Sequence, residues 1–297
     1  MFNDLKGIQG PRDIKEREES VLEKLLKIEE RVVQEYVGKV AVLYKENHDN
    51  IYLPLYTSLS SALPSYTEQD LQALIRAKAN NGYNDKEAQV LGIYTGVLLH
   101  VLTERCEQEK KPTVFTFDLN ENEFHYLFYF AKRAGEVTVR RVKGNRTCSL
   151  MGSYDGQVEK LVIEQNKGDG AAWSAGNEGG KIGTLLINQN KGNCAAWRAG
   201  SDGGKIGTLL INENTGSHAA QWAGSDRGKI GTLLIIQNTG DYVAWSAGRF
   251  GGKIDTLALY QAGRNTGESA EANRIVTGEE ALKLYERLMG EMKCLKT

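Results

Sequence analysis

The chain has 297 residues, of which 40% are hydrophobic and 25% charged, a mixture typical of a globular protein with a substantial buried core. Its 37 basic and 38 acidic residues leave a formal net charge of −1, which argues against a general role in binding nucleic acid or an anionic membrane surface. Its four cysteines lack metal-ligand spacing, and neither a signal peptide nor an apolar run long enough to span a bilayer is found, so we expect a cytoplasmic protein without metal or cofactor.

Residues 1–132 are predicted to form a mostly helical domain. Apolar residues recur at helical spacing between Asp13 and about Asn47, which predicts one long amphipathic helix. This helix would pack on its own domain or pair with a second copy of itself. Residues 48–66 contain two prolines together with many Ser and Thr residues, and we expect them to form a connecting loop.

Two further helices are predicted from their caps. Thr67 can accept hydrogen bonds from the first free amides of a helix that ends near Asn80. Asn84 or Asp85 can cap the next helix, which continues to about Glu109 and is apolar on nearly all sides in its middle. Such a helix is expected at the centre of its domain.

A strand over 113–117, a helix over 121–133 and a strand over 136–140 are predicted to complete the domain. Strand, helix and strand in this order form a crossover that places the two strands parallel. The second strand also matches the repeat that follows, because Val137 precedes Leu161 by 24 residues.

The segment from about residue 157 to 260 repeats one motif every 24 residues. Each copy carries a lysine followed by Ile-x-Thr-Leu, at Lys181, Lys205, Lys229 and Lys253. Glycine and β-branched residues recur where a helical repeat would need helix formers, whereas this length suits one coil of a parallel β-helix with coils about 4.8 Å apart. Because the repeat lacks the six-residue apolar pattern of left-handed β-helices, we predict the right-handed form.

The predicted fold is therefore α+β and has three parts. A mostly helical domain over 1–132, which includes the crossover, precedes a right-handed parallel β-helix of about six coils over 133–276. A C-terminal capping or packing helix follows over 277–297. The coils are expected to start near residues 133, 157, 181, 205, 229 and 253.

The divergent second coil indicates which side chains face the core. Lys160 takes the place of Thr184 there, and a lysine would not stack in a dry core. The positions that alternate with it are therefore predicted to point inward: Leu161, Leu185, Leu209, Leu233, Leu257, Ile163, Ile187, Ile211 and Ile235. The apolar residues between them point outward and need a cover, which the helical domain, the C-terminal helix or a second copy would supply: Val162, Leu186, Leu210 and Leu234.

Four other columns of side chains recur in the coils. Glycines expected to adopt a positive φ at a turn are Gly168, Gly192, Gly216 and Gly240. Asparagines expected to bond from coil to coil are Asn166, Asn190, Asn214 and Asn238. Tryptophans that form either packed corners or an exposed platform for sugars or bases are Trp173, Trp197 and Trp245. Acidic residues expected to neutralise the lysine column are Glu178, Asp202 and Asp226. Calcium binding by these residues is the alternative, but the sequence lacks the Gly-Gly-x-Gly-x-Asp pattern of calcium-binding β-rolls.

The glycine pattern resembles that of a known group of β-helices. Residues 238–244, Gly248 and 251–254, echoed by residues 192–206, resemble the glycine-patterned β-helix shared by the glutamate synthase C-terminal domain and the β-helical chain of formylmethanofuran dehydrogenase. The resemblance implies a right-handed scaffold that supports other domains or subunits and carries no catalytic residues. The motif Ala-Ala-Trp197 departs from the family pattern, and residues 1–132 show no resemblance.

No catalytic constellation is found in the sequence. The outward positions of the clearest strand are Thr and Leu rather than the Asp, Arg and Lys clusters of polysaccharide-cleaving β-helices. The four histidines are scattered, and His100 and His125 fall within predicted helices, where we expect structural roles.

We therefore expect a non-enzymatic scaffold or assembly module that contacts a protein partner or a second copy through the helical domain. One alternative is a carbohydrate-binding or carbohydrate-acting β-helix; the other, implied by the resemblance, is a structural subunit of an oxidoreductase complex. The predicted interaction surface consists of Leu186, Leu210, Leu234, Trp173, Trp197 and Trp245.

Overall fold

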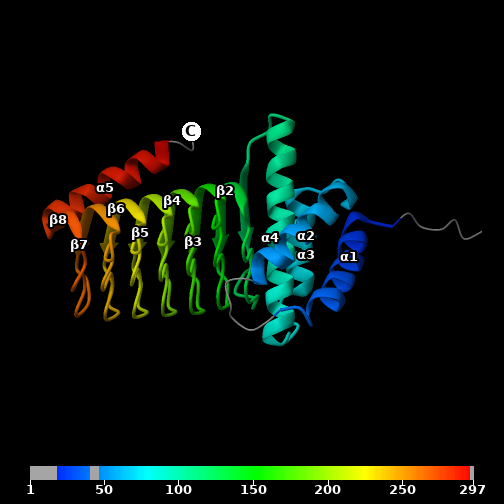
Figure 1. The fold of residues 1–297 in the computed structure, drawn as a ribbon, viewed down its shortest axis with the longest axis horizontal. Helices are drawn as coiled ribbons and strands as arrows, with labels where there is room; N and C mark the ends of the chain where they lie inside the picture. The colour runs from blue at the N-terminus through cyan, green and yellow to red at the C-terminus, as the bar shows by residue number, and fades with distance from the viewer. Residues whose placement is uncertain (1–18, 41–46, 295–297) are drawn as a thin grey trace, which may run out of the picture.

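The computed structural model describes residues 19–40 and 47–294. N-terminal helices, a solenoid of parallel strands and a C-terminal helix follow one another along the chain (Figure 1). The strands lie side by side in one sheet, and the N-terminal helices stand at one end of it. The predicted α+β fold, with a parallel β-solenoid between helical segments, is confirmed.

The N-terminal region is built around α4 (Asp85–Gln108), whose middle is buried on all sides as its apolar sequence predicts. The helices packed around it are α1 (Val21–Tyr36), α2 (Asn47–Ala62) and α3 (Glu68–Lys78). Both predicted caps are present. The Thr67 hydroxyl accepts a hydrogen bond from the Asp70 amide at 3.3 Å, and the Asn84 side-chain oxygen accepts one from the Glu87 amide at 3.1 Å.

The loop predicted over 48–66 is wrong, because α2 occupies most of this segment. Ile51, Tyr52 and Leu55 are buried along one side of the helix, whereas Pro54 lies on the exposed side. Apolar residues at helical spacing therefore outweighed the proline and the many hydroxyl residues.

The helix predicted from Asp13 to Asn47 is observed in part. α1 begins after the cap Ser20 and ends at Tyr36. Residues 13–18 and 41–46 of the predicted helix lie outside the described residues.

The solenoid consists of eight parallel strands that are hydrogen-bonded in sequence order. They are β1 (Val114–Asp118), β2 (Arg133–Arg140), β3 (Gln157–Glu164), β4 (Lys181–Asn188), β5 (Lys205–Asn212), β6 (Lys229–Ile236), β7 (Lys253–Tyr260) and β8 (Ala272–Thr277). The strands β2 to β7 begin at the six predicted starts, so one period is one coil. Shorter coils join β1 to β2 and β7 to β8, since Val114 pairs with Glu136 and Ile254 with Ala272.

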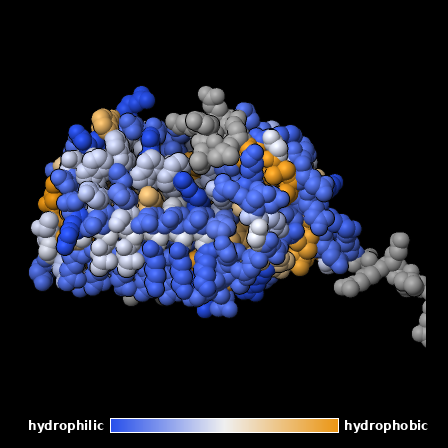
Figure 2. Space-filling model, turned by 90° about the horizontal axis from the view of Figure 1, so that it is seen from below, coloured by the Kyte–Doolittle hydropathy of each residue, from blue (hydrophilic) through white to orange (hydrophobic). Residues whose placement is uncertain are grey.

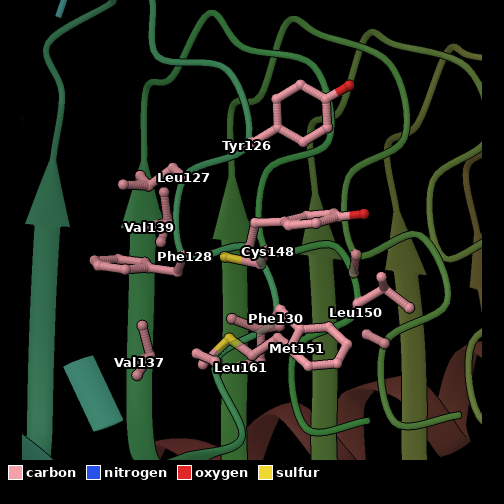
Figure 3. Close-up of a cluster of buried hydrophobic side chains, with 14 of the residues drawn as sticks. Tyr126, Leu127, Phe128, Phe130, Val137, Val139, Cys148, Leu150, Met151 and Leu161 are labelled. Atoms are coloured by element: carbon pink, nitrogen blue, oxygen red, sulfur yellow. The ribbon is translucent and has the colours of Figure 1, made fainter. Parts of the chain in front are cut away.

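The helix predicted over 121–133 is wrong, because this segment forms turns on the side of the first coil opposite the sheet. Tyr126, Phe128 and Phe130 have φ values of 59°, 55° and 65°, which an α-helix does not allow. The Phe130 amide donates to the Ser149 carbonyl at 3.0 Å, so the turns bond to the next coil. Because alternate residues of this segment adopt positive φ, the side chains of Phe128 and Phe130 point into the solenoid, where they face the inward side of the strands (Figure 3).

The predicted inside and outside of the sheet are both confirmed. The inward Leu and Ile columns belong to a large core that continues into the helical region. The outward stripe of Val162, Leu186, Leu210 and Leu234 forms a separate cluster on the other face of the sheet. The C-terminal helix α5 (Glu279–Cys294) packs over this stripe across the last coils (Figure 1), as the cover hypothesis requires.

The first coil is closed off by α4. Gly92 and Gly96 lie on the side of α4 that touches residues 126–131, and neither position has room for a side chain. A Cβ on Gly92 would lie 2.6 Å from the Tyr126 Cβ, and one on Gly96 would lie 2.5 Å from the Tyr129 carbonyl oxygen. The two glycines therefore allow α4 to sit directly on the end of the solenoid core.

The asparagine column forms the expected ladder over three coils. The Asn166 amide donates to the Asn190 side-chain oxygen at 2.8 Å, and Asn190 donates to Asn214 at 2.7 Å. Each of these asparagines is fully buried, so the ladder satisfies polar groups that would otherwise be costly. Asn238 instead accepts a hydrogen bond from the Gly240 amide at 2.7 Å.

The positive φ predicted for the glycine column is wrong. In the described part of the chain, Gly168, Gly192, Gly216 and Gly240 do not appear among the glycines with positive φ. They are needed because successive coils approach too closely there for a side chain. A Cβ on Gly192 would overlap the Gly168 carbonyl and lie 2.8 Å from the Asp169 nitrogen.

Candidate protein-interaction surfaces

The three leucines of the predicted interaction surface lie beneath α5. Leu210 and Leu234 have an exposed fraction of 0%, and Leu186 of 7%. Leu284 and Leu288 of α5 pack against the same cluster. The stripe is therefore an internal surface of this chain, and these leucines cannot contact a partner while α5 is in place.

The three predicted tryptophans are half-buried and do not form one column. Trp173 and Trp197 stack with ring centroids 5.2 Å apart and planes 4° apart. The Arg146 guanidinium lies 4.2 Å from the Trp173 ring centroid, so both faces of Trp173 are covered. Trp245 meets Trp222 edge-on at 5.8 Å instead. Trp173 thus exposes mainly its ring edge, as expected for a packed corner.

Two members of the acidic column, Asp202 and Asp226, pair with an arginine and not with the predicted lysine column. Asp202 and Asp226 lie 2.8 Å and 3.6 Å from the Arg198 guanidinium, on the same side of the solenoid as the tryptophans. The lysine that begins β7, Lys253, instead lies 3.5 Å from Asp255. Among the described residues, no group of three or more His, Cys, Asp and Glu side chains is arranged to hold a metal ion.

A partly buried network of ionisable side chains joins α2, α4 and the first coil. The Tyr52 hydroxyl lies 2.7 Å from His100 Nδ1 and accepts a hydrogen bond from the Lys132 amide at 3.3 Å. His100 Nε2 lies 3.2 Å from a Glu104 oxygen, and the other Glu104 oxygen accepts from the Tyr56 hydroxyl at 2.7 Å. The Tyr56 ring also stacks on His100, with centroids 4.6 Å apart.

The hydrogen bonds of this network can all form while the His100 imidazole is neutral. Because Tyr52 accepts from the Lys132 amide, its own proton is free to bond His100 Nδ1, which leaves the ring proton on Nε2 facing Glu104. Burial lowers the pKa of His100 despite the nearby carboxylate. Burial together with the hydrogen bond to Glu104 raises the pKa of Tyr56 to about 12. The arrangement ties the helical region to the solenoid, as expected for a structural histidine.

His125 and His218 lie in turns of the solenoid. His125 was predicted to lie in a helix, which is wrong; it belongs to the first coil, where Nδ1 accepts from the Asn145 amide at 3.1 Å. His218 stacks on Tyr242 with centroids 5.4 Å apart.

The C-terminal end of the solenoid is open, and this surface was missed from the sequence. Ile275 of β8 pairs with Leu257 and so continues an inward column of the core, yet 58% of it is exposed. Ala270 and Ala272 are only partly buried beside it. Hydrophobic side chains are visible at this end of the molecule (Figure 2). The only sequence signal is the Ile-Val pair after the repeat register ends.

The opposite edge of the sheet is closed. Glu68 and Gln72 of α3 accept hydrogen bonds from the amides of Thr116 and Asp118 on the outer side of β1, at 2.5 Å and 3.0 Å. In the described part of the chain, β8 is bonded to β7 alone. The molecule therefore has one protected sheet edge and one edge with free backbone groups.

No protein-family model, curated protein or solved structure matches this chain significantly. None of the helices in the described ranges is long and apolar enough to span a bilayer.

Proposed function

We propose that this protein is a non-enzymatic scaffold whose C-terminal solenoid end binds another protein. The observation that carries this proposal is Ile275, a core position that remains 58% exposed. Solenoids need polar caps at both ends, because a terminal coil otherwise leaves its apolar side in water. Here α4 caps the first coil, while α5 covers the outer face of the sheet and leaves the last coil uncapped.

The free backbone edge of β8 supports the same proposal. An exposed edge strand with an apolar side chain is a template for pairing with a further strand. The contact through the helical domain and the oxidoreductase-subunit role both stay predictions from the sequence. A sugar-binding platform has less support, because Arg146 and Trp197 cover the two faces of Trp173.

The proposal is tested by placing a photo-crosslinking amino acid at position 275 and expressing the full chain in its native host. Position 205 serves as the control, since Lys205 is exposed on a strand in the middle of the sheet. We expect a discrete protein adduct from position 275 and none from position 205. A protein without adducts at position 275 would show that the open end is not a binding surface.

A further inference from the structure

We propose that the partner of the open end is a second copy of this chain, paired β8 to β8 in antiparallel orientation. This inference rests on the proposed function, because it names the protein that covers Ile275. Three features of the described chain carry it: the topology of the sheet, the side chains of the last coil and the distribution of charge at this end.

The topology restricts how two copies can meet. The β1 edge is occupied by Glu68 and Gln72, so among the described strands a sheet edge is available at β8 only. When each copy offers the same edge, the two copies are related by a twofold axis and the assembly closes at two. A twofold axis perpendicular to the sheet reverses the strand direction, which makes the pairing antiparallel.

The side chains of β8 fit this arrangement. Ala272 and Ile275 lie in register with Ile254 and Leu257, so they are the last members of inward columns. The twofold axis keeps the inner face of the sheet on the inside for both copies. Each Ile275 is then covered by the inner side chains of the other copy, and the two solenoid cores become continuous.

The charges at this end are self-complementary. Arg264 and Glu268 are exposed on the last coil, with the arginine before Gly267 and the acid after it. Glu271 also follows Gly267, but it already lies 3.6 Å from Arg249 of its own chain, so Glu268 is the acid available to a second copy. A twofold axis near Gly267 reverses this order, so Arg264 of each copy faces the acidic side of the other. With a net charge of −1, the chains also have little general repulsion.

The purified full chain is tested by light scattering at micromolar concentrations. We expect a mass of twice 32.8 kDa for the wild type, and the monomer mass for Ile275→Lys, which would place a charge in the joined core. Val114→Lys is the matched control: Val114 is also on an edge strand and is 57% exposed, but its edge is closed, so this variant should remain a dimer. An unchanged tryptophan fluorescence spectrum would show that both variants are folded.

A charge exchange provides a second measurement. Arg264→Glu should weaken the dimer by at least about tenfold, and the double variant Arg264→Glu/Glu268→Arg should restore it. A wild-type monomer, or equal loss of the dimer in Ile275→Lys and Val114→Lys, would overturn the inference. If the wild type is monomeric while position 275 cross-links to a different protein, the second copy is excluded and the proposed function stands.

Discussion

Replacing Gly192 by alanine tests how the coils are held together. Gly192 has no positive φ, so alanine fits its backbone, but the added Cβ would lie 2.8 Å from the Asp169 nitrogen and closer still to the Gly168 carbonyl. A Cβ atom essentially never lies within 3.0 Å of a non-bonded heavy atom, so the two coils would have to separate. The carbonyl of Gly192 in turn lies against Gly216, which blocks movement in the other direction.

Overpacking of this kind costs about 1–3 kcal/mol, and because both neighbouring coils resist we expect about 3 kcal/mol for Gly192→Ala. Gly203→Ala is the matched control. Gly203 has a φ of 79° and nothing within 4 Å of an added Cβ, so it should cost only the strain of a left-handed alanine, about 1 kcal/mol.

Urea unfolding followed by tryptophan fluorescence measures both variants, because all four tryptophans belong to the solenoid. A Gly192→Ala variant no less stable than Gly203→Ala would refute the close-approach argument. A larger loss at Gly203 would instead show that positive φ, rather than coil spacing, decides where this repeat needs glycine.

Three further predictions use the same unfolding assay. Burial lowers the pKa of His100 in the folded chain, so the unfolded chain binds the proton more tightly. The free energy of unfolding should therefore be highest above pH 6.5, the ordinary pKa of histidine, and should fall as the pH drops below that value. His100→Gln should flatten this pH dependence. Leu234→Ala should cost about 2–5 kcal/mol in the full chain but less than about 1 kcal/mol in a chain without α5. Leu233→Ala, on the inner face, should cost the same with and without α5. Equal losses for Leu234→Ala in the two chains would contradict the cover by α5. Asn190→Ala should cost about 1–3 kcal/mol because it leaves buried ladder partners unpaired, and replacement of the exposed Gln157 by alanine should be nearly neutral.

The strands and the direction of their side chains could be predicted because each position in one coil has an equivalent position in the other coils. One exception, Lys160, was enough to identify the outer face. In the structure Lys160 is 8% exposed, and its ammonium group lies on that face, 3.3 Å from Glu136. Comparison of equivalent positions in successive coils therefore identified the inner and outer faces, which the sequence of one strand alone could not do.

The turns could not be predicted because local preferences oppose them. Phe128 and Phe130 adopt positive φ although bulky residues rarely do, since bonds to the next coil and burial of the rings offset the strain. The aromatic, apolar segment 121–133 is therefore predicted as a helix unless its contacts with the next coil are known. The open end was missed for a different reason: its strand begins after a shorter coil, where the repeat register no longer applies.

The position of α5 also bears on how the open edge can pair. Val276 of β8 is 3% exposed beneath α5, and Arg274 of the same strand forms an ion pair with Glu280 at the start of this helix. β8 is thus held by β7 on one side and by α5 on its outer face, while Ile275 between these contacts stays open. A strand that is already fixed loses little conformational freedom when a second strand binds, so less of the binding energy is spent on ordering. The helix that covers the outer face of the sheet therefore also prepares its free edge for a partner.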